Sequence, residues 1–96
     1  MTVGYLISKE AKDDLKRIYH FGYLEFDEQQ TDDYFHRFFA AFQKMANNPL
    51  HYESVDHIRL GYRRYPYNSD TIYYRLNNTK VEIMAILGGQ DLDTWL

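Results

Sequence analysis

The sequence contains no cysteine, and it has no apolar run of the ~20 residues that are needed to span a lipid bilayer. The lack of cysteine excludes disulfides, thiolate nucleophiles and cysteine-ligated zinc sites. Met1 leads directly into a strand-like segment instead of the basic and apolar pattern of a signal peptide. These absences favour a cytoplasmic protein that makes no contact with a membrane.

Basic residues are also scarce, since 11 Lys and Arg face 14 Asp and Glu, which gives a formal net charge of −3. A general nucleic-acid-binding protein normally has a strong basic excess, so we expect no direct, specific binding to nucleic acid. The 96 residues are enough for a single domain, residues 1–96, with a small core. A hydrophobic fraction of 45% argues against disorder.

The positive charge that is present gathers in residues 58–75, IRLGYRRYPYNSDTIYYR. This segment has one acidic residue, Asp70, against four arginines, which are Arg59, Arg63, Arg64 and Arg75. Five tyrosines lie among them, and guanidinium groups beside phenol rings are a pairing with which proteins bind phosphates, stacked bases or carboxylates. Four arginines with so little acid nearby repel one another unless something binds them. The segment therefore predicts a binding surface.

The first half of the chain predicts one strand and two helices. Residues 2–7 alternate as in a short strand. Ser8 is a good N-cap for the first helix, whose apolar stripe is Ala11, Leu15, Ile18, Gly22 and Phe26. The glycine in this stripe would let a second helix approach closely. Asp27 is placed to cap that second helix, which runs to about Asn47. The short connection between them requires an antiparallel helical hairpin.

The second half predicts three strands, at residues 58–67, 71–76 and 81–87, with turns at Asn68-Ser69 and Asn77-Asn78 and a polar connector at residues 51–56. The last strand, VEIMAIL, is apolar on both faces, so we expect it to be central and to pair with the N-terminal strand. The predicted fold class is α+β, in the order β-α-α-β-β-β. A helical hairpin packs on one face of a small, mainly antiparallel four-stranded sheet.

A hairpin that turns at residues 68–69 also predicts a register for the basic segment. Tyr62 lies opposite Arg75, and Arg64 lies opposite Tyr73, with all four side chains on one face. Other aromatic side chains are expected in the core: Tyr5, Tyr74 and the phenylalanines of the second helix.

Five motifs follow one another along nearly the whole chain: A-x-x-D-L-x-x-I at residues 11–18, A-N-N-P at 46–49, I-R-L-G-Y-R-R-Y at 58–65, I-Y-Y-R at 72–75 and V-E-I-M-A-I-L at 81–87. In this order and spacing they resemble the RelE/ParE superfamily of bacterial toxins, and more closely its ParE branch. The resemblance implies a cytoplasmic bacterial toxin that is encoded beside a small ParD-like antitoxin and silenced by it. We expect no cofactor.

Two activities are known in this superfamily: RelE-like members cut messenger RNA on the ribosome, whereas ParE-like members poison DNA gyrase. RNA cleavage through the 2′-hydroxyl needs a base, an acid and cations around the transition state. This chain supplies only the cations. The lysines that RelE-like nucleases carry in this stretch are missing, since no lysine occurs between Lys44 and Lys80. In addition, Gly88 and Gly89 replace the Tyr or His that relatives usually carry after the last strand.

The histidines do not change this interpretation. His51 and His57 could act as a substitute acid and base, but ordinary connector histidines are the simpler explanation. His20 and His36 have no partners at metal-binding spacing, so no metal site is expected.

The residues and the resemblance together favour a toxin without catalytic residues that inhibits DNA gyrase by binding. Two alternatives stay open: a RelE-like mRNA endonuclease, and a binding module of the same fold that has lost its activity. The missing side chain at Gly88 would account for such a loss. The predicted target-binding residues are Arg59, Arg63, Arg64, Tyr73, Arg75 and Trp95. We expect an acidic, amphipathic antitoxin segment to lie in a groove of the sheet and helical hairpin and to cover Arg63 and Arg64.

Overall fold

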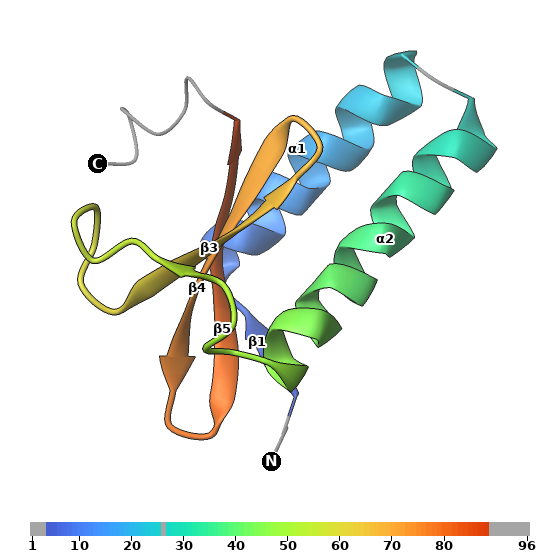
Figure 1. Cartoon of the computed structure of the whole chain (residues 1–96). Helices are drawn as coiled ribbons and strands as arrows, with labels where there is room; N and C mark the ends of the chain where they lie inside the picture. The colour runs from blue at the N-terminus through green and yellow to red at the C-terminus, as the bar shows by residue number, and fades with distance from the viewer. Residues whose placement is uncertain (1–3, 26, 89–96) are drawn as a thin grey trace.

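The structure is a computed structural model that describes residues 4–25 and 27–88 (Figure 1). Its elements in chain order are β1 (Tyr5–Ile7), α1 (Lys9–Glu25), α2 (Glu28–Asn47), β2 (Glu53–Ser54), β3 (Tyr62–Tyr67), β4 (Asp70–Asn77) and β5 (Lys80–Gly88). The helices run antiparallel beside the sheet, which confirms the predicted α+β class and helical hairpin. Among the residues described, neither helix is long and apolar enough to cross a membrane.

Within the described residues the sheet has five strands, in the order β1-β5-β4-β3-β2, where four were predicted. The additional strand, β2, pairs Glu53 with Arg64 and Ser54 with Arg63 inside the segment that was predicted to be a connector. Two residues are too few to show the alternation by which strands are recognised in a sequence. β5 lies between β1 and β4, as predicted, and β1 is its parallel neighbour.

The strand predicted over residues 58–67 begins only at Tyr62. Residues 55–61 form a turn, which we call the 55–61 loop. Its Gly61 has a φ of +84°, a conformation that glycine adopts without a steric penalty from a Cβ atom. Arg59 therefore belongs to this loop and not to the strand. The turn at Asn68-Ser69 is confirmed, whereas the next turn lies one residue later than predicted, at Asn78 and Thr79.

Both predicted helix caps are present. The backbone N–H of Ala11 donates to Ser8 Oγ at 3.1 Å, and the same hydroxyl donates to the Met84 carbonyl at 3.1 Å, so the cap also joins α1 to β5. The backbone N–H of Gln30 donates to Asp27 Oδ1 at 2.8 Å at the start of α2. Capping side chains of this kind typically contribute ~1 kcal/mol each.

Gly22 lies where the two helices approach closely, as predicted. A Cβ atom at this position would be 3.1 Å from the Thr31 methyl carbon, which is tighter than ordinary van der Waals contact. Phe26, the last residue of the predicted stripe, lies outside the described residues.

The short β1 pairs with only part of β5. Beyond it, two side chains of α1 bind the backbone of β5. The Ile86 N–H donates to Asp14 Oδ2 at 2.9 Å, and Arg17 Nη2 donates to the Ile86 carbonyl at 3.1 Å. An open strand edge is a template for unwanted pairing. Asp14, part of the first motif above, thus has a structural role.

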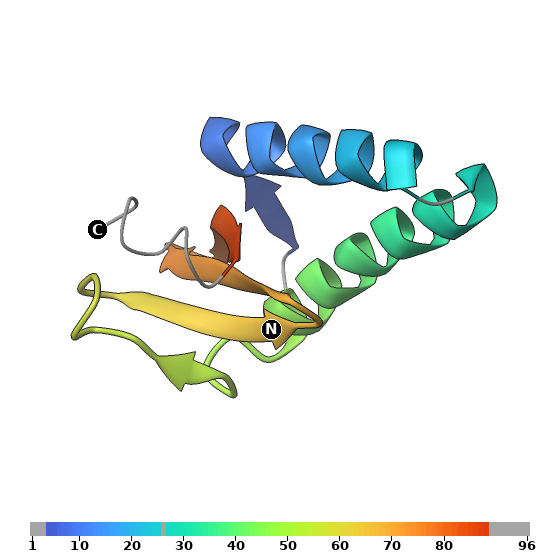
Figure 2. The same ribbon diagram turned by 90° about the horizontal axis from the view of Figure 1, so that it is seen from above.

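The helices cover one face of the sheet, the helix face, and leave the opposite, outer face to other contacts (Figure 2). The helix-face core comprises Ala11, Leu15, Phe38, Ala41, Phe42, Met45, Ala46, Ile72, Tyr74, Val81, Ile83 and Ile86. Each fully buried large side chain contributes about 1.5–3 kcal/mol relative to an exposed one. A second, smaller cluster packs on the outer face and comprises Val55, Tyr62, Tyr73, Ala85 and Leu87.

Candidate functional site

The β3–β4 hairpin has the register predicted from its turn, with Tyr62 opposite Arg75 and Arg64 opposite Tyr73. Tyr62 and Tyr73 belong to the outer-face cluster. Cross-strand partners and next-but-one neighbours in a strand share a face, so Arg64 and Arg75 lie on the outer face with them. The hairpin therefore brings two of the predicted target-binding arginines together on the side of the sheet away from the helices.

These two arginines do not lack acidic partners, and in this respect the sequence prediction was wrong. Arg64 Nε forms an ion pair with the Glu53 carboxylate, and Arg75 Nε lies 2.9 Å from Glu82 Oε1. The hydrogen bonds to these carboxylates raise the pKa of each guanidinium. The acids come from β2 and β5, so their proximity is a property of the sheet and not of the basic segment.

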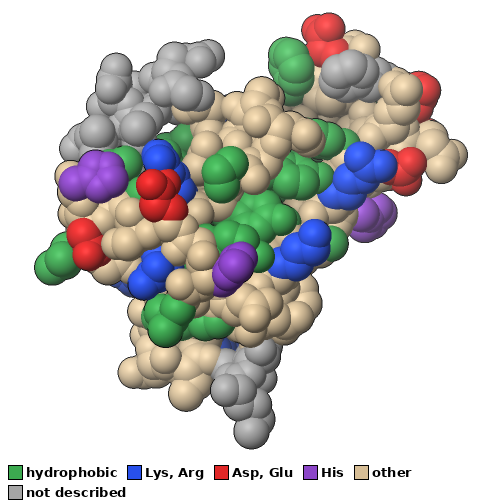
Figure 3. Space-filling model, in the orientation of Figure 1, with side chains coloured by type: hydrophobic (Ala, Val, Ile, Leu, Met, Phe, Trp, Pro, Cys, Tyr) green, Lys and Arg blue, Asp and Glu red, His purple; other side chains and the backbone are tan. Residues whose placement is uncertain are grey.

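Both ion pairs remain accessible to a partner. The Arg64 and Arg75 side chains are 36% and 42% exposed. Solvent-exposed pairs contribute only ~0–1 kcal/mol, so exchanging Glu53 or Glu82 for a carboxylate of a target would cost little. In Figure 3, acidic and basic side chains lie next to each other over the left half of the molecule, near β3 and the 55–61 loop.

Tyr62 joins the loop arginine to this surface. The guanidinium carbons of Arg59 and Arg75 each lie 6.0 Å from the centre of the Tyr62 ring, which is within the range of a cation–π interaction. Tyr62 itself is buried, and so is Tyr73. We call the group Arg59, Tyr62, Arg64 and Arg75 the outer basic patch. Tyr73, predicted to touch the target, is buried with Tyr62 in the outer-face cluster.

Arg63 is separated from the patch, because it points to the helix face. Its Nη1 donates to the Tyr52 carbonyl at 2.7 Å, and its charge lies close enough to Tyr74 to oppose the burial that raises the pKa of that phenol. The assignment of Arg63 and Arg64 to one antitoxin site stays a prediction, but the two side chains lie on opposite faces of the sheet. Trp95 lies outside the described residues.

Of the two tyrosines expected in the core, Tyr74 is confirmed as a buried member, and Tyr5 packs against the core while remaining partly buried. Tyr74 is fully buried, and its hydroxyl donates to the Pro49 carbonyl at 2.7 Å. Tyr5 is half-buried and packs edge-on against Phe42, with ring centres 5.4 Å apart. In α2, Phe38 and Phe42 are fully buried, whereas Phe35 and Phe39 are half-buried.

The histidines are exposed in every case and are spread over the molecule. His51 packs edge-on against Tyr52, and His57 lies in the 55–61 loop. Among residues 4–25 and 27–88, no three His, Asp or Glu side chains are grouped so that they could hold a metal ion.

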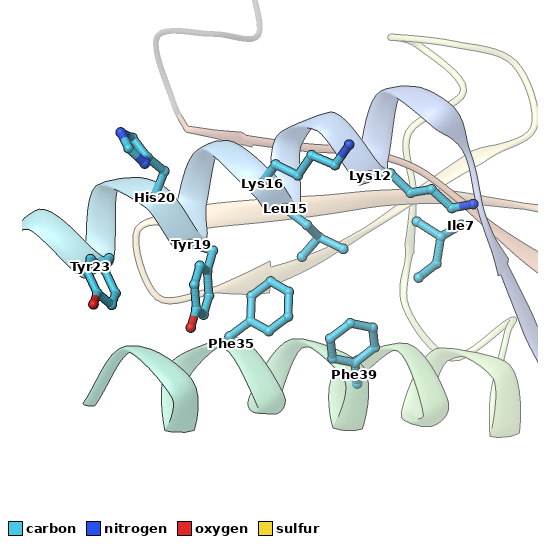
Figure 4. Close-up of a pocket in the computed structure, with 9 residues that line it drawn as sticks. All are labelled: Ile7, Lys12, Leu15, Lys16, Tyr19, His20, Tyr23, Phe35 and Phe39. Atoms are coloured by element: carbon cyan, nitrogen blue, oxygen red, sulfur yellow. The ribbon is translucent and has the colours of Figure 1, made fainter. Parts of the chain in front are cut away.

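A second candidate site is an apolar groove of about 850 Å³ between α1 and α2 (Figure 4). Its apolar lining is formed by Ile7, Leu15, Tyr19, Tyr23, Phe35 and Phe39. Tyr19 and Phe35 meet edge-on across the gap, with ring centres 5.0 Å apart, and the Tyr19 hydroxyl donates to Asp32 Oδ1 at 2.8 Å. Lys12, Lys16 and His20 recur every fourth residue along α1 at the border of this groove.

The antitoxin groove predicted from the sequence is one of the sheet and helical hairpin at Arg63 and Arg64, and it stays a prediction. The α1–α2 groove was not predicted from the sequence. The signal that could have located it is the pairing of two stripes on α1, with Lys12, Lys16 and His20 beside Leu15, Tyr19 and Tyr23. A helix that is apolar along one stripe and basic along the next can bind a partner helix of opposite charge.

Comparison with known proteins gives concordant results. Residues 5–92 match the family model for the ParE toxin of the type II toxin–antitoxin system, parDE. Toxin ParE1 of Caulobacter vibrioides is 30% identical over 83 residues, which cover 86% of this chain and 85% of that protein. Toxin ParE1 of Mycobacterium tuberculosis is 28% identical over 88 residues, covering 91% and 90%. In fold, a chain from the chromosomal ParDE system of P. aeruginosa matches with a TM-score of 0.78 at 11% identity, covering 91% of this chain and 96% of that one.

Proposed function

Because this chain belongs to the family of ParE toxins of type II toxin–antitoxin systems, we propose that it inhibits DNA gyrase by binding to the enzyme and trapping its DNA-cleaved complex. The proposal assigns no catalytic residue to the chain. The observation that carries it is the family match over residues 5–92, since ParE-like members of the superfamily are its gyrase poisons. A ParD-like antitoxin is the proposed neutralising partner.

Inhibition of this kind requires only that the toxin binds one conformational state of gyrase more tightly than the others. The outer basic patch suits such a task, because Arg and Tyr are enriched among the residues that dominate protein interfaces. Arg64 and Arg75 are half-exposed and positioned by their strands, and Tyr62 holds the side chain of Arg59 near them. The patch offers a partner cations that are already ordered.

RNA cleavage finds less support in the same residues. A nuclease needs an acid and a base beside its cations. The side chains that interact with Arg64 and Arg75 are of two kinds. The carboxylates already form ion pairs, and the tyrosines are packed in the sheet. No lysine lies between Lys44 and Lys80, and Gly88 ends β5 without a side chain. RelE-like cleavage therefore serves as the alternative that the experiment must be able to detect.

The α1–α2 groove is the proposed antitoxin site. Its floor is almost wholly apolar, and its border carries Lys12 and Lys16. An amphipathic segment with one apolar face flanked by acidic residues would bury that floor and pair with the lysines. This partner chemistry is complementary to the groove, and it leaves the outer basic patch on the other side of the sheet for the target.

The proposal is tested by titrating the purified protein into gyrase with relaxed plasmid and ATP. The expected result is a dose-dependent loss of supercoiling, with linear plasmid released when the stalled complexes are denatured. No effect at a large molar excess of folded protein would overturn the proposal. Cleavage of messenger RNA on ribosomes by the same preparation would then support the nuclease alternative, and inactivity in both assays would support a binding module without toxicity.

A further inference from the structure

Leu60 is the most exposed large hydrophobic side chain in the described part of the chain, at 86%. Single exposed leucines are common on protein surfaces and need no explanation by themselves. Two features set Leu60 apart: the hydrogen-bonded loop that carries it, and its place in the chain directly after Arg59 of the outer basic patch.

The 55–61 loop is held in one conformation by its own hydrogen bonds. The N–H groups of Ile58 and Arg59 donate to the Val55 carbonyl at 2.8 and 3.0 Å, and the Tyr62 N–H donates to the Arg59 carbonyl at 3.1 Å. Asp56 Oδ1 accepts from the Gly61 N–H at 2.8 Å. Val55, completely buried, fixes the start of the loop in the outer-face cluster. Leu60 is thus presented to solvent by an ordered backbone.

The loop also places Leu60 at the border of the outer basic patch. Leu60 directly follows Arg59, whose guanidinium lies over the Tyr62 ring on which Arg75 also packs. Ile58, two residues earlier, packs inward on the outer-face cluster, so the loop divides its two aliphatic side chains between the core and solvent. An exposed aliphatic side chain thus directly follows, in the chain, one cation of the outer basic patch.

The 55–61 loop and the α1–α2 groove lie on opposite sides of the sheet. In both Figure 1 and Figure 2 the loop projects at the left, beyond β3, whereas the helices lie on the other side of the sheet. A segment bound in the groove would leave Leu60 uncovered. The loop is therefore available for a different partner from the one that the groove fits.

We propose that Leu60 is the apolar contact by which this toxin docks on gyrase, inserting into an apolar pocket of the enzyme that is bordered by carboxylates. This inference rests on the proposed gyrase inhibition and names the surface that would perform it. The pocket is filled by Leu60, and its carboxylates pair with Arg59 and Arg75. Because the loop is ordered before binding, little conformational entropy is lost when the contact forms.

The test compares Leu60→Ser with Leu50→Ser, a matched control in which another exposed leucine, 66% accessible and outside the loop, undergoes the same change. Both variants should keep the thermal unfolding midpoint of the wild type, because neither side chain is packed. We expect Leu60→Ser to need at least tenfold more protein for half-inhibition of supercoiling, about 1.4 kcal/mol of binding free energy. Leu50→Ser and the apolar replacement Leu60→Met should inhibit like the wild type.

The outcomes separate this inference from the function on which it rests. Equal inhibition by the wild type and Leu60→Ser would overturn the role of Leu60 and leave gyrase inhibition standing. Equal losses in Leu60→Ser and Leu50→Ser would also overturn it, since the effect would then be unspecific. Failure of the wild type to inhibit gyrase would overturn the proposed function, and the docking role of Leu60 with it.

Discussion

Arg63 and Arg64 are consecutive in the sequence and lie on opposite faces of the sheet. Arg63 donates to the Tyr52 carbonyl on the helix face, at 2.7 Å, whereas Arg64 pairs with Glu53 on the outer face. The side-chain period of a strand is two residues, so neighbours in a strand cannot share a surface. We therefore expect different tasks for these two like residues of one motif.

Separate alanine variants should distinguish these tasks. Arg64→Ala removes a half-exposed ion pair, so we expect a change of less than ~1 kcal/mol in the free energy of unfolding and a clear loss of gyrase inhibition. Arg63→Ala removes a charged hydrogen bond to a backbone carbonyl, so we expect a loss of about 1–2 kcal/mol in unfolding free energy. Urea denaturation and plasmid supercoiling measure the two effects. Normal inhibition by a folded Arg64→Ala variant would contradict the assignment of this residue to the target.

The parts of the fold that the sequence predicted are those governed by local rules. Ser8 and Asp27 cap their helices because a side-chain oxygen there binds the first free N–H groups, whatever the rest of the chain does. The register of the β3–β4 hairpin follows from the turn at Asn68, whose φ of +53° suits asparagine. One correctly placed turn therefore located Tyr62, Arg64, Tyr73 and Arg75.

The parts that the sequence did not predict depend on contacts between distant segments. Glu53 and Glu82 neutralise Arg64 and Arg75 only because β2 and β5 are their neighbours in the sheet. The α1–α2 groove arises from the way in which two helices diverge, which no residue spacing within one helix encodes. Residues 58–61 were misassigned because Ile58 has a high strand propensity, while Gly61 and the Asp56 side chain stabilise a turn instead.

Tyr67 and Tyr74 should respond in opposite ways to removal of the hydroxyl group. The Tyr74 hydroxyl donates to the Pro49 carbonyl at 2.7 Å, so Tyr74→Phe leaves that carbonyl without its partner and should cost about 1–2 kcal/mol in unfolding free energy. The buried Tyr67 hydroxyl has no hydrogen-bond partner among the described residues. Tyr67→Phe should therefore leave stability unchanged or raise it by up to ~1 kcal/mol. Urea unfolding of both variants measures this, and a larger loss in Tyr67→Phe would contradict it.

The titration of Tyr74 should lower the free energy of unfolding at alkaline pH. Burial raises its pKa to about 12, from an unfolded value of about 10. Between these values the folded protein keeps a proton that the unfolded chain releases, so the free energy of unfolding falls as the pH rises. We expect wild-type protein to lose on the order of 2 kcal/mol more than Tyr74→Phe does between pH 10 and pH 12. Parallel declines of the two proteins in urea unfolding would show that Tyr74 does not titrate in this way.

The α1–α2 groove makes a prediction about the antitoxin that is independent of gyrase. Reversing the charges at its border in Lys12→Glu/Lys16→Glu should weaken binding of the cognate antitoxin at least tenfold, because acidic side chains of the partner would then be repelled. The control Lys9→Glu/Lys44→Glu makes the same change in net charge at two exposed lysines that do not line the groove. Calorimetric titration at two salt concentrations measures the difference, which should shrink in high salt because these charges are exposed.

Equal weakening in both variants would show that only the overall field matters, and unchanged binding in the groove variant would place the antitoxin elsewhere. Retained gyrase inhibition by the groove variant would show that the two partners use different surfaces.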